Sequence, residues 1–443
     1  MTEFRRRPHA AWLVLLLVWP TARADAGPIT ITSPGAGETW CVGSRHVIAW
    51  KVEPAATARV EFSDDDGKTW TEVSSRTPAA GTLEWLVPDR VSESCRVRVS
   101  PEGVAEGGVS GRFRVAPSRE VKEYRWVQVN GKAPFAPRDG AGALTFRGKM
   151  WLIGGWNPGD KAHFPRICSN DVWNSADGRD WAQIKPNTFR DRSFDPTADW
   201  EGRHTAGYVV HREKLWIVGG DVNQGHYQSD VWSSADGAAW TLENRDRPVP
   251  WGPRALHYTL TFRDRIWVIG GQTMPAFAPS PEVFHRDIWT TTNGRDWEQV
   301  KPKEPYWSAR GMIGGSVVHK DRIWILGGGT YDTPTTPARR YYNDVWSSPD
   351  GVTWERHAEH APWTARQYHD TAAFDGRLWV LEGFTGANRN DVWYSDDGSN
   401  WYEVPATPWK PRHAASVFVH DGALWMVAGN NMKPDVWKLV RGR

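Results

Sequence analysis

The chain has 443 residues, with 54 Lys and Arg against 52 Asp and Glu and a formal net charge of +2. Such a length is enough for more than one domain, and the near balance of charge argues against a dedicated nucleic-acid binder, which carries a concentrated basic excess. The 30 Trp and 42 Gly, beside few helical patterns, favour many short strands joined by turns. We therefore expect an all-β protein that binds no nucleic acid.

Residues 1–26 have the pattern of a signal peptide. Arg5-Arg6-Arg7 precedes an apolar run from Ala10 to Trp19, and Ala22-Arg23-Ala24 gives a small-x-small cleavage site. The run of about ten residues is too short for a helix across a bilayer of roughly 30 Å, and no later segment is long enough either. We expect an exported protein, periplasmic or extracellular, without a transmembrane segment. An uncleaved anchor is the alternative.

A small β-sandwich is predicted for residues 28–116. Strand-like runs alternate with turns there, and Trp50 and Trp85 are expected to face inward. Because the compartment is expected to be oxidising, we predict a disulfide between Cys41 and Cys95, worth roughly 4 kcal/mol in the chain-entropy model. Cys168 would then be an unpaired thiol in a loop. The block resembles the immunoglobulin-like modules of secreted bacterial proteins.

The stretch SDDDGKTW, Ser63 to Trp70, matches the Asp-box pattern S-x-D-x-G-x-T-W that is seen in sialidases. In this box the Asp and Ser side chains bond the backbone of a hairpin turn, so the match predicts a turn and not sialidase chemistry. Three successive Asp would also suit calcium, and of the two we favour a solvated turn.

From Tyr124 onward the chain repeats itself with a period of about 45 to 60 residues. One strand of each repeat carries a Trp that is followed, in most copies, by Gly-Gly, as in KLWIVGG. A later strand reads NDVW or a close variant, and its Trp recurs at Trp173, Trp232, Trp289, Trp346, Trp393 and Trp437. These marks resemble the kelch motif, and the resemblance implies a β-propeller over residues 124–443.

The sixth copy lacks its last strand, because the chain stops at DVWKLVRGR. YRWVQV, residues 124–129, repeats the W-x-Q-[VI] of the last strand of other copies, so we expect it to complete the final blade and close the ring. The predicted fold is a six-bladed kelch-type β-propeller preceded by a small immunoglobulin-like β-sandwich.

An aromatic residue, two further residues and an arginine precede each inner strand. The arginines are Arg138, Arg203, Arg254, Arg310, Arg366 and Arg412. The aromatic residues are Phe135, Trp200, Trp251, Trp307, Trp363 and Trp409. The loops that lead into the inner strands share one face of a propeller with the long loops between its second and third strands, and binding usually resides on such loops.

Two interpretations of the six arginines stay open. They would line the mouth of the channel and bind an anionic or carbohydrate ligand, with the Trp faces stacking on sugar rings. Alternatively, each would pair with the aspartate that opens the third strand of its blade and hold the strands in register. Those aspartates are Asp171, Asp230, Asp287, Asp344, Asp391 and Asp435.

Residues that break the repeat are candidates for an individual role in binding. They lie at the start of an inner strand or after the second strand, and we assign them, with the six arginines, to a ligand site: Trp156, His204, His257, Tyr368, His369, Glu382 and His413. A histidine at such a place is more often a hydrogen-bonded structural residue than a ligand-binding one.

Two enzyme families resemble parts of the chain. Arg366 to His369 resembles the start of one strand in galactose oxidase, a copper enzyme, but the crosslinked Cys–Tyr pair and C-terminal module of that family have no counterpart here. Exported kelch sialate mutarotases also have six blades, and Glu382 would be an acid–base group in that case. We expect instead a monomeric, non-catalytic binder of a glycan or protein partner, without a cofactor or bound metal.

Overall fold

The computed structural model describes residues 29–51, 57–77, 81–101, 107–117, 124–222, 226–273, 283–311, 314–330, 339–404 and 407–442. Residues 1–26, the predicted signal peptide, lie outside these ranges. Among the described residues, no helix has the length and apolar character needed to cross a bilayer. One short 3-10 turn, η1 (Lys161–His163), accompanies the strands of the described part of the chain.

The N-terminal domain is a sandwich of two sheets. The smaller sheet has the order β1-β3-β6, with β1 (Thr30–Ser33), β3 (Arg45–Lys51) and β6 (Thr82–Leu86). The larger sheet has the order β2-β9-β7-β4-β5, with β8 also paired to β7: β2 (Thr39–Cys41), β4 (Ala58–Ser63), β5 (Thr71–Thr77), β7 (Ser92–Pro101), β8 (Gly108–Val109) and β9 (Phe113–Ala116). Trp50 and Trp85 are buried between the sheets, as expected.

The disulfide predicted between Cys41 and Cys95 is wrong. Both residues are buried, and neither is joined to another cysteine. Cys41 on β2 is opposite Ala116 of β9, whereas Cys95 on β7 is opposite Phe113 of the same strand. One whole strand therefore lies between the two cysteines, a spacing of about 9 to 10 Å, and their partners on β9 are a further three residues apart along that strand. The two cysteines are thus well beyond the span of roughly 7 Å that a disulfide bridges.

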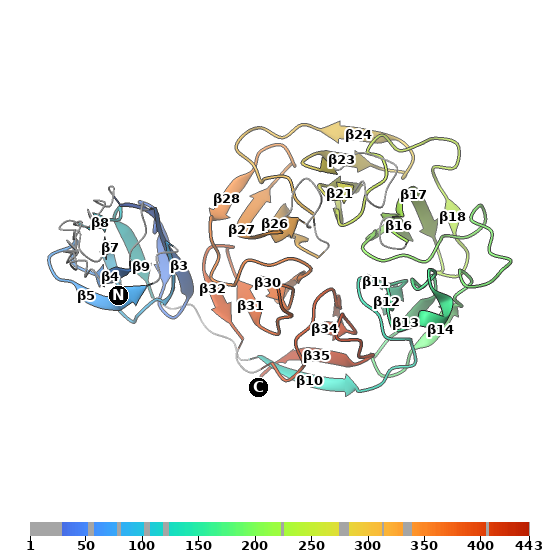
Figure 1. Ribbon diagram of the computed structural model, residues 1–443, viewed down its shortest axis with the longest axis horizontal. Helices are drawn as coiled ribbons and strands as arrows, with labels where there is room; N and C mark the ends of the chain where they lie inside the picture. The colour runs from blue at the N-terminus through green and yellow to red at the C-terminus, as the bar shows by residue number, and fades with distance from the viewer. Residues whose placement is uncertain are drawn as a thin grey trace, which may run out of the picture.

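Residues 124–442 form six blades within the described part of the chain, arranged in a ring in Figure 1. The inner strands are β11 (Gly142–Phe146), β15 (Gly207–His211), β19 (Tyr258–Phe262), β25 (Ser316–His319), β29 (Asp370–Phe374) and β33 (Ser416–His420). The second strands are β12 (Lys149–Ile153), β16 (Lys214–Asp221), β20 (Arg265–Ile269), β26 (Arg322–Thr330), β30 (Arg377–Leu381) and β34 (Ala423–Val427).

The outer half of each blade is built from its third and fourth strands. The third strands are β13 (Val172–Ser175), β17 (Tyr227–Ser234), β23 (Ile288–Thr291), β27 (Arg340–Ser348), β31 (Val392–Ser395) and β35 (Val436–Arg441). The fourth strands are β14 (Ala182–Lys185), β18 (Thr241–Leu242), β24 (Trp297–Val300), β28 (Glu355–Ala358), β32 (Trp401–Glu403) and β10 (Tyr124–Asn130). A small hairpin of β21 (Gln272–Thr273) and β22 (Val283–Phe284) extends the third blade.

The ring closes through the first strand of the propeller. β10 pairs antiparallel with β35, so that the N-terminal strand supplies the outer edge of the last blade. The inner strands of neighbouring blades lie side by side all the way round, including β33 beside β11. Since each sheet has no core of its own, this ring buries both faces of every blade against its neighbours.

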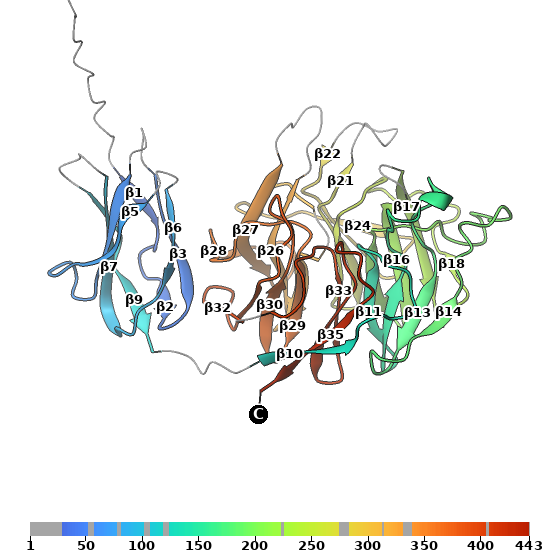
Figure 2. The same ribbon diagram turned by 60° about the horizontal axis from the view of Figure 1, so that its bottom comes forward.

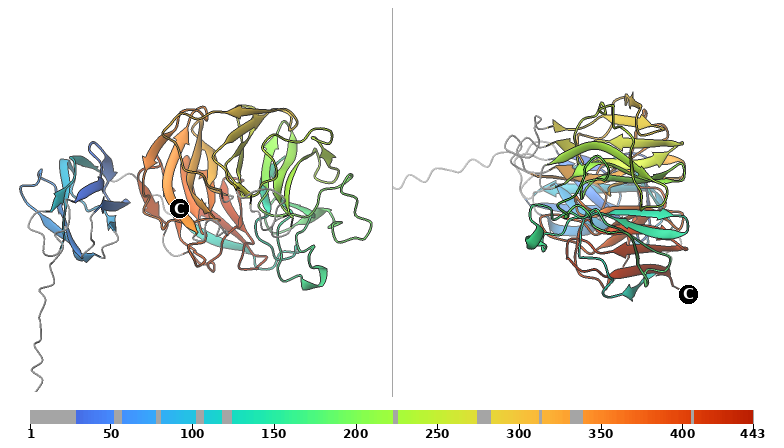
Figure 3. Two further views of the ribbon diagram at one scale, coloured as in Figure 1. Left: turned by 45° about the horizontal axis from the view of Figure 1, so that its top comes forward. Right: turned by 90° about the vertical axis from the view of Figure 1, so that its right-hand side faces the viewer.

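The sandwich lies beside the fourth and fifth blades, at one end of the molecule (Figures 2 and 3). β3 of the sandwich pairs at one position with β32, Arg45 opposite Trp401, so that a sheet of the sandwich continues into the fifth blade. We call the face of the propeller at which the inner strands begin the upper face.

Candidate functional site

Each of the six arginines on the upper face is paired with the aspartate of its own blade. Two hydrogen bonds join each guanidinium to a carboxylate, as in Arg138 with Asp171 at 2.6 and 3.0 Å. The pattern recurs in Arg203–Asp230, Arg254–Asp287, Arg310–Asp344, Arg366–Asp391 and Arg412–Asp435. The pairing interpretation therefore holds at all six positions.

These arginines are not open to a ligand. Each is at most 1% exposed, and each also donates to the carbonyl that ends the second strand of its blade. The carbonyl of the arginine itself accepts from the blade before it, as in Gly155 N to Arg203 O at 2.8 Å. Each arginine thus joins three strands of its blade to the neighbouring blade. These six side chains therefore do not form the basic ligand-binding mouth that was one of the two interpretations of the sequence.

The aromatic residues of the same motif are structural too. Each is at most 3% exposed and meets the Trp of the fourth strand of its blade edge to face, with ring centroids 5.2 to 6.0 Å apart. In the last blade this partner is Trp126 of β10. Buried edge-to-face pairs of this kind stabilise a core, so the Trp faces are not available for stacking on a sugar.

An open ring of backbone hydrogen bonds joins, in five of the six blades, the residues that lie two positions after the arginines. Thr205 N donates to Gly140 O, Gly140 N to Ala414 O, and Ala414 N to Tyr368 O, at 2.8 to 3.1 Å. Leu256 N extends the ring by donating to Thr205 O at 3.1 Å. All five residues have φ between 50° and 63°. The backbone of Tyr368 thus belongs to the repeating scaffold, and only its side chain is peculiar to one blade.

The residues that break the repeat gather at the upper rim of the channel. His413 Nδ1 lies 2.6 Å from Asn388 Oδ1, and Asn388 Nδ2 donates to Asn430 Oδ1 at 3.3 Å. Asn430 Nδ2 donates in turn to Asp139 Oδ2 at 2.9 Å. The chain of hydrogen bonds crosses from the fifth and sixth blades to the first. We call these four residues the rim chain.

Protonation states along the rim chain follow from burial. Burial lowers the pKa of His413 to about 4, with Arg339 adding to the effect, so that this imidazole is neutral at pH 7. Because Asn388 Oδ1 can only accept, His413 Nδ1 carries the proton and its Nε2 is left as an acceptor. Burial raises the pKa of Asp139 to about 6, against the opposing effects of His204 and the Asn430 hydrogen bond.

Aromatic rings flank the rim chain at both ends. The Tyr368 ring stacks on His413, with centroids 5.2 Å apart, and the Trp156 ring stacks on His204 at 5.8 Å. His204 Nδ1 lies 3.1 Å from Asp221 O and 3.6 Å from the buried Cys168 Sγ. Burial raises the pKa of that thiol, which makes Cys168 a structural thiol.

Two buried polar groups at the rim have no partner within the described residues. Gln367 is 0% exposed, yet neither its amide oxygen nor its amide nitrogen is hydrogen-bonded. Trp156 Nε1 likewise has no acceptor among these residues. Buried polar atoms are nearly always satisfied by protein, water or ligand, so the rim retains a capacity for polar contacts that the described scaffold does not use.

A pair of carboxyl groups lies deeper, at the start of β29. Glu382 and Asp370 are close enough for each carboxyl group to affect the pKa of the other, and Glu382 Oε1 and Asp370 Oδ2 have no hydrogen-bond partner among the described residues. Burial raises the pKa of Asp370 to about 7, and burial together with the neighbouring Asp370 raises that of Glu382 well above its usual value. Both groups therefore hold a proton to a higher pH than an ordinary carboxyl group does.

The carboxyl pair borders the central channel. Asp370 lines a cavity of about 160 Å³ inside the ring, together with Tyr208 and small residues of the inner strands such as Ala143 and Gly207. Glu382 lies behind it, fully buried, in a left-handed conformation with φ 48° at a position that is glycine in four other blades. A strained, buried acid at such a place points to a function.

Comparison with known proteins addresses the repeats. No family model matches the chain. Kelch repeat and BTB domain-containing protein 12 of Danio rerio is 27% identical over 315 residues, covering 65% of this chain and 46% of that protein. Beta-scruin and alpha-scruin of Limulus polyphemus are 22% and 25% identical, covering 67% and 59% of this chain and 31% and 28% of those proteins.

The repeats of this chain are kelch repeats. The chain spans less than half the length of these curated relatives. A solved structure described as that of YjhT matches with a TM-score of 0.43 and 14% identity, covering 79% of this chain and 95% of that one. The kelch assignment concerns the repeats and the propeller, and it carries no partner or activity with it.

The kelch propeller brings together only some of the residues predicted for the site. Trp156, His204, Tyr368 and His413 meet at the rim. His257 and His369 are buried between blades instead, with His369 Nε2 only 2.7 Å from Leu326 O. Such a histidine is a structural hydrogen-bonding residue, which was the alternative weighed from the sequence.

Sequence reasoning missed several residues of the site. Asp139 and Gln367 directly follow the arginines of their blades, as His204 and His413 do, whereas the third and fourth blades have alanine and glycine there. A comparison of this one position across the six repeats would have found both. Asn388 lies in a loop of irregular length, and no sequence signal places it beside His413.

Proposed function

We propose that this chain is an exported, non-catalytic binding protein that holds a glycan at the upper rim of its kelch propeller. The binding face is the one expected from the sequence, but the contacts come from residues that break the repeat. The paired arginines and buried Trp rings only build the scaffold. Export rests on the signal-peptide pattern of residues 1–26.

The rim chain is the observation that carries the proposal. It offers amide, imidazole and carboxyl groups in one series of hydrogen bonds, between two aromatic stacks that include Trp156 and Tyr368. Planar polar side chains beside aromatic rings suit a sugar, whose hydroxyl groups donate and accept hydrogen bonds and whose ring faces are apolar. The neutral His413 Nε2 adds an acceptor.

A glycan array tests this proposal. We expect the purified chain to bind a restricted set of glycans and His413→Ala to weaken binding at least about tenfold, which corresponds to the loss of one or two good hydrogen bonds. His420→Ala is the matched control, because His420 ends the same inner strand on the opposite side of the propeller. Binding that is equal in the two variants, or capture of proteins but of no glycan, would contradict the proposal.

A second function, acid–base catalysis on a sugar, is favoured by the Asp370–Glu382 pair. A carboxyl group with a pKa of about 7 is able to take up and release a proton at neutral pH. Asp370 also borders a cavity of about 160 Å³, within the range of one sugar ring. Proton NMR of anomer exchange in reducing sugars tests it: acceleration by the protein that is lost in Asp370→Asn would establish catalysis, and exchange at the uncatalysed rate would exclude it.

A further inference from the structure

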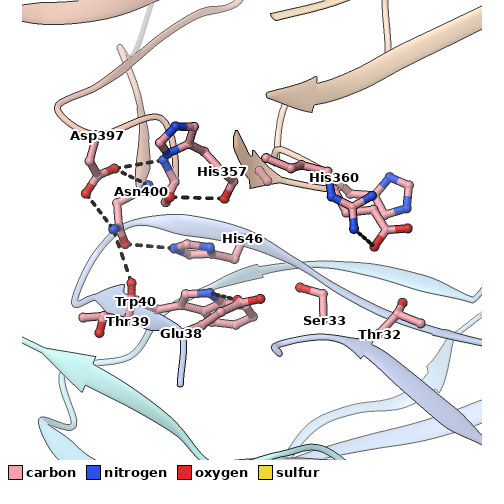
Figure 4. Close-up of a pocket in the computed structure, with 14 residues that line it drawn as sticks. Thr32, Ser33, Glu38, Thr39, Trp40, His46, His357, His360, Asp397 and Asn400 are labelled. Carbon is pink, nitrogen blue, oxygen red and sulfur yellow. Dashed lines mark hydrogen bonds and ion pairs between the residues drawn. The ribbon is translucent and has the colours of Figure 1, made fainter. Parts of the chain in front are cut away.

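A cleft of about 550 Å³ lies between the sandwich and the propeller, away from the rim (Figure 4). On the sandwich side it is bordered by β1, by the segment from Glu38 to Trp40 and by His46. On the propeller side it is bordered by β28 with the loop after it, and by the turn before β32. Its volume is in the range of small-molecule sites, which often form between domains.

Asn400 builds the inner end of this cleft and joins its two walls. Its Oδ1 accepts from Cys41 N at 2.9 Å and lies 3.2 Å from His46 Nε2, and its Nδ2 donates to Thr39 O at 3.3 Å. The side chain is 4% exposed. The corresponding residues of the other blades are Asp180, Ala239, Asp296 and Thr353. None of these four residues is an asparagine, and Asn400 lies where the fifth blade contacts the sandwich.

The wall around Asn400 is rigid. His46 stacks on Trp40 with ring centroids 4.2 Å apart, and His357 packs against Trp324 at 4.5 Å. Burial lowers the pKa of His46 to about 3, so this imidazole is neutral. Ser399 Oγ donates to His357 O at 3.1 Å, which fixes the turn before β32 to the edge of the fourth blade. Polar groups held in this way are oriented before a ligand arrives.

The lining chemistry selects a class of ligand. Hydroxyl, carboxyl, imidazole and amide groups make up most of the surface, and Ala358 is the one lining residue among the described residues with a plain aliphatic side chain. The guanidinium of Arg356 is already 3.4 Å from the carboxylate of Glu359. A phosphate or sulfate would therefore meet no free guanidinium here, and a lipid chain would meet too little apolar surface.

We propose that this interdomain cleft is a second binding site, specific for a neutral saccharide of about two sugar rings. Its hydroxyl groups match a surface of mixed donors and acceptors without net positive charge. The ligand touches both domains, so its binding stabilises the orientation of the sandwich relative to the fifth blade. The inference is independent of the proposed function, because no residue of the rim chain borders the cleft.

The test uses calorimetric titration of the full chain with cellobiose, lactose, maltose and N,N′-diacetylchitobiose. Thr32 borders the cleft from β1, so Thr32→Trp is designed to fill it, while Thr30→Trp on the same strand is the matched control outside the lining. We expect at least one of these sugars to bind, Thr32→Trp to weaken it about tenfold or more, and Thr30→Trp to leave it within about twofold. Ser399→Ala removes one lining hydroxyl together with its bond to His357 O, and we expect it to give a second and smaller loss.

His413→Ala separates this site from the rim. We expect the variant to bind the cleft ligand with unchanged affinity, whatever it does to binding at the rim. The inference is overturned if none of the four sugars binds at millimolar concentration, if binding survives in Thr32→Trp, or if it disappears in His413→Ala. It is also overturned if only sulfated or phosphorylated sugars bind in a Thr32-dependent way.

Discussion

Arg366 and Asp391 are joined by two hydrogen bonds of 2.8 and 2.6 Å where three strands of the fifth blade meet. Arg366 also donates to Glu382 O at 2.7 Å, and its own carbonyl accepts from Gly328 N of the fourth blade at 3.2 Å. Burial alone would raise the pKa of Asp391, but the guanidinium outweighs it and holds that pKa below its usual range. The same arrangement recurs in every blade, so the six pairs hold the strands of each blade together and join neighbouring blades.

Breaking one such pair is expected to destabilise the whole propeller. Arg366→Ala leaves a buried carboxylate without its partner, which lowers the free energy of unfolding by about 3–5 kcal/mol. Urea unfolding followed by Trp fluorescence measures the change. The exposed Arg389 of the same blade is the control, because Arg389→Ala removes no buried pair and is expected to stay within about 0.5 kcal/mol of the unmodified chain. A decrease in the free energy of unfolding of less than about 1 kcal/mol for Arg366→Ala would show that the pair does not hold the blades together.

The Asp370–Glu382 pair predicts a particular pH dependence. Both folded-state pKa values are raised, so the stability is complete below the ordinary carboxyl range near 4 and declines as the pH rises through about 7. Glu382→Gln removes the Glu382 carboxyl group and with it that group's part of the decline, which amounts to at most about 1.4 kcal/mol per pH unit for one group.

Unfolding midpoints of the chain and of Glu382→Gln, measured from about pH 5 to pH 8, give the comparison. We expect the variant to gain stability relative to the unmodified chain as the pH rises. Parallel profiles across this range would mean that the pKa of Glu382 is not raised in the folded chain.

Ala428 offers a stabilising substitution. It directly follows the second strand of the sixth blade and has φ 56°, at a position that is glycine in four other blades. A left-handed conformation strains any residue with a Cβ, so Ala428→Gly is expected to raise the free energy of unfolding by about 0.5–1 kcal/mol. In Ala423→Gly, at the start of the same strand, the ordinary effect of glycine is a loss of similar size. Thermal unfolding of both variants measures the two changes in stability. Equal losses of stability in Ala428→Gly and Ala423→Gly would mean that Ala428 is not strained.

Asn400 is expected to control how firmly the sandwich is held. Asn400→Ala removes the acceptor of Cys41 N and the donor to Thr39 O, both across the domain interface. Hydrogen–deuterium exchange of the Cys41 amide should become roughly tenfold faster or more. Thr353→Ala changes the corresponding, exposed residue of the fourth blade and should leave this amide unchanged. Unaltered exchange in Asn400→Ala would mean that other contacts hold the domains.

The repeats could be read from the sequence because each repeated residue has one structural task that is the same in all blades. Gly-Gly, the aromatic residue before the arginine, and the Trp of the second, third and fourth strands all recur at fixed places, and the kelch propeller follows from them. YRWVQV resembles the fourth strands closely enough to predict its place in the last blade, where the structure has β10.

The choice between two uses of Arg366 could not be made from the sequence. Arginine and aspartate on one face are compatible with a ligand-binding site and also with structural ion pairs. Only the distance between their side chains distinguishes these two interpretations. The position of Cys95 relative to Cys41 could not be predicted either, because the strand order β2-β9-β7 depends on contacts between segments far apart in the sequence. The rim chain depends on the loop that carries Asn388. The path of this loop could not be predicted, because the loop is not part of the repeated pattern.

Arg412 and His413, adjacent in the chain, allow the central claim to be tested in one experiment. The claim is that residues obeying the repeat build the propeller and residues breaking it bind the ligand. Urea unfolding and glycan binding are measured in parallel on Arg412→Lys and His413→Ala. We predict that Arg412→Lys loses stability but, while folded, keeps its affinity, and that His413→Ala loses affinity with little change in stability. Loss of affinity in folded Arg412→Lys, with binding intact in His413→Ala, would contradict the account.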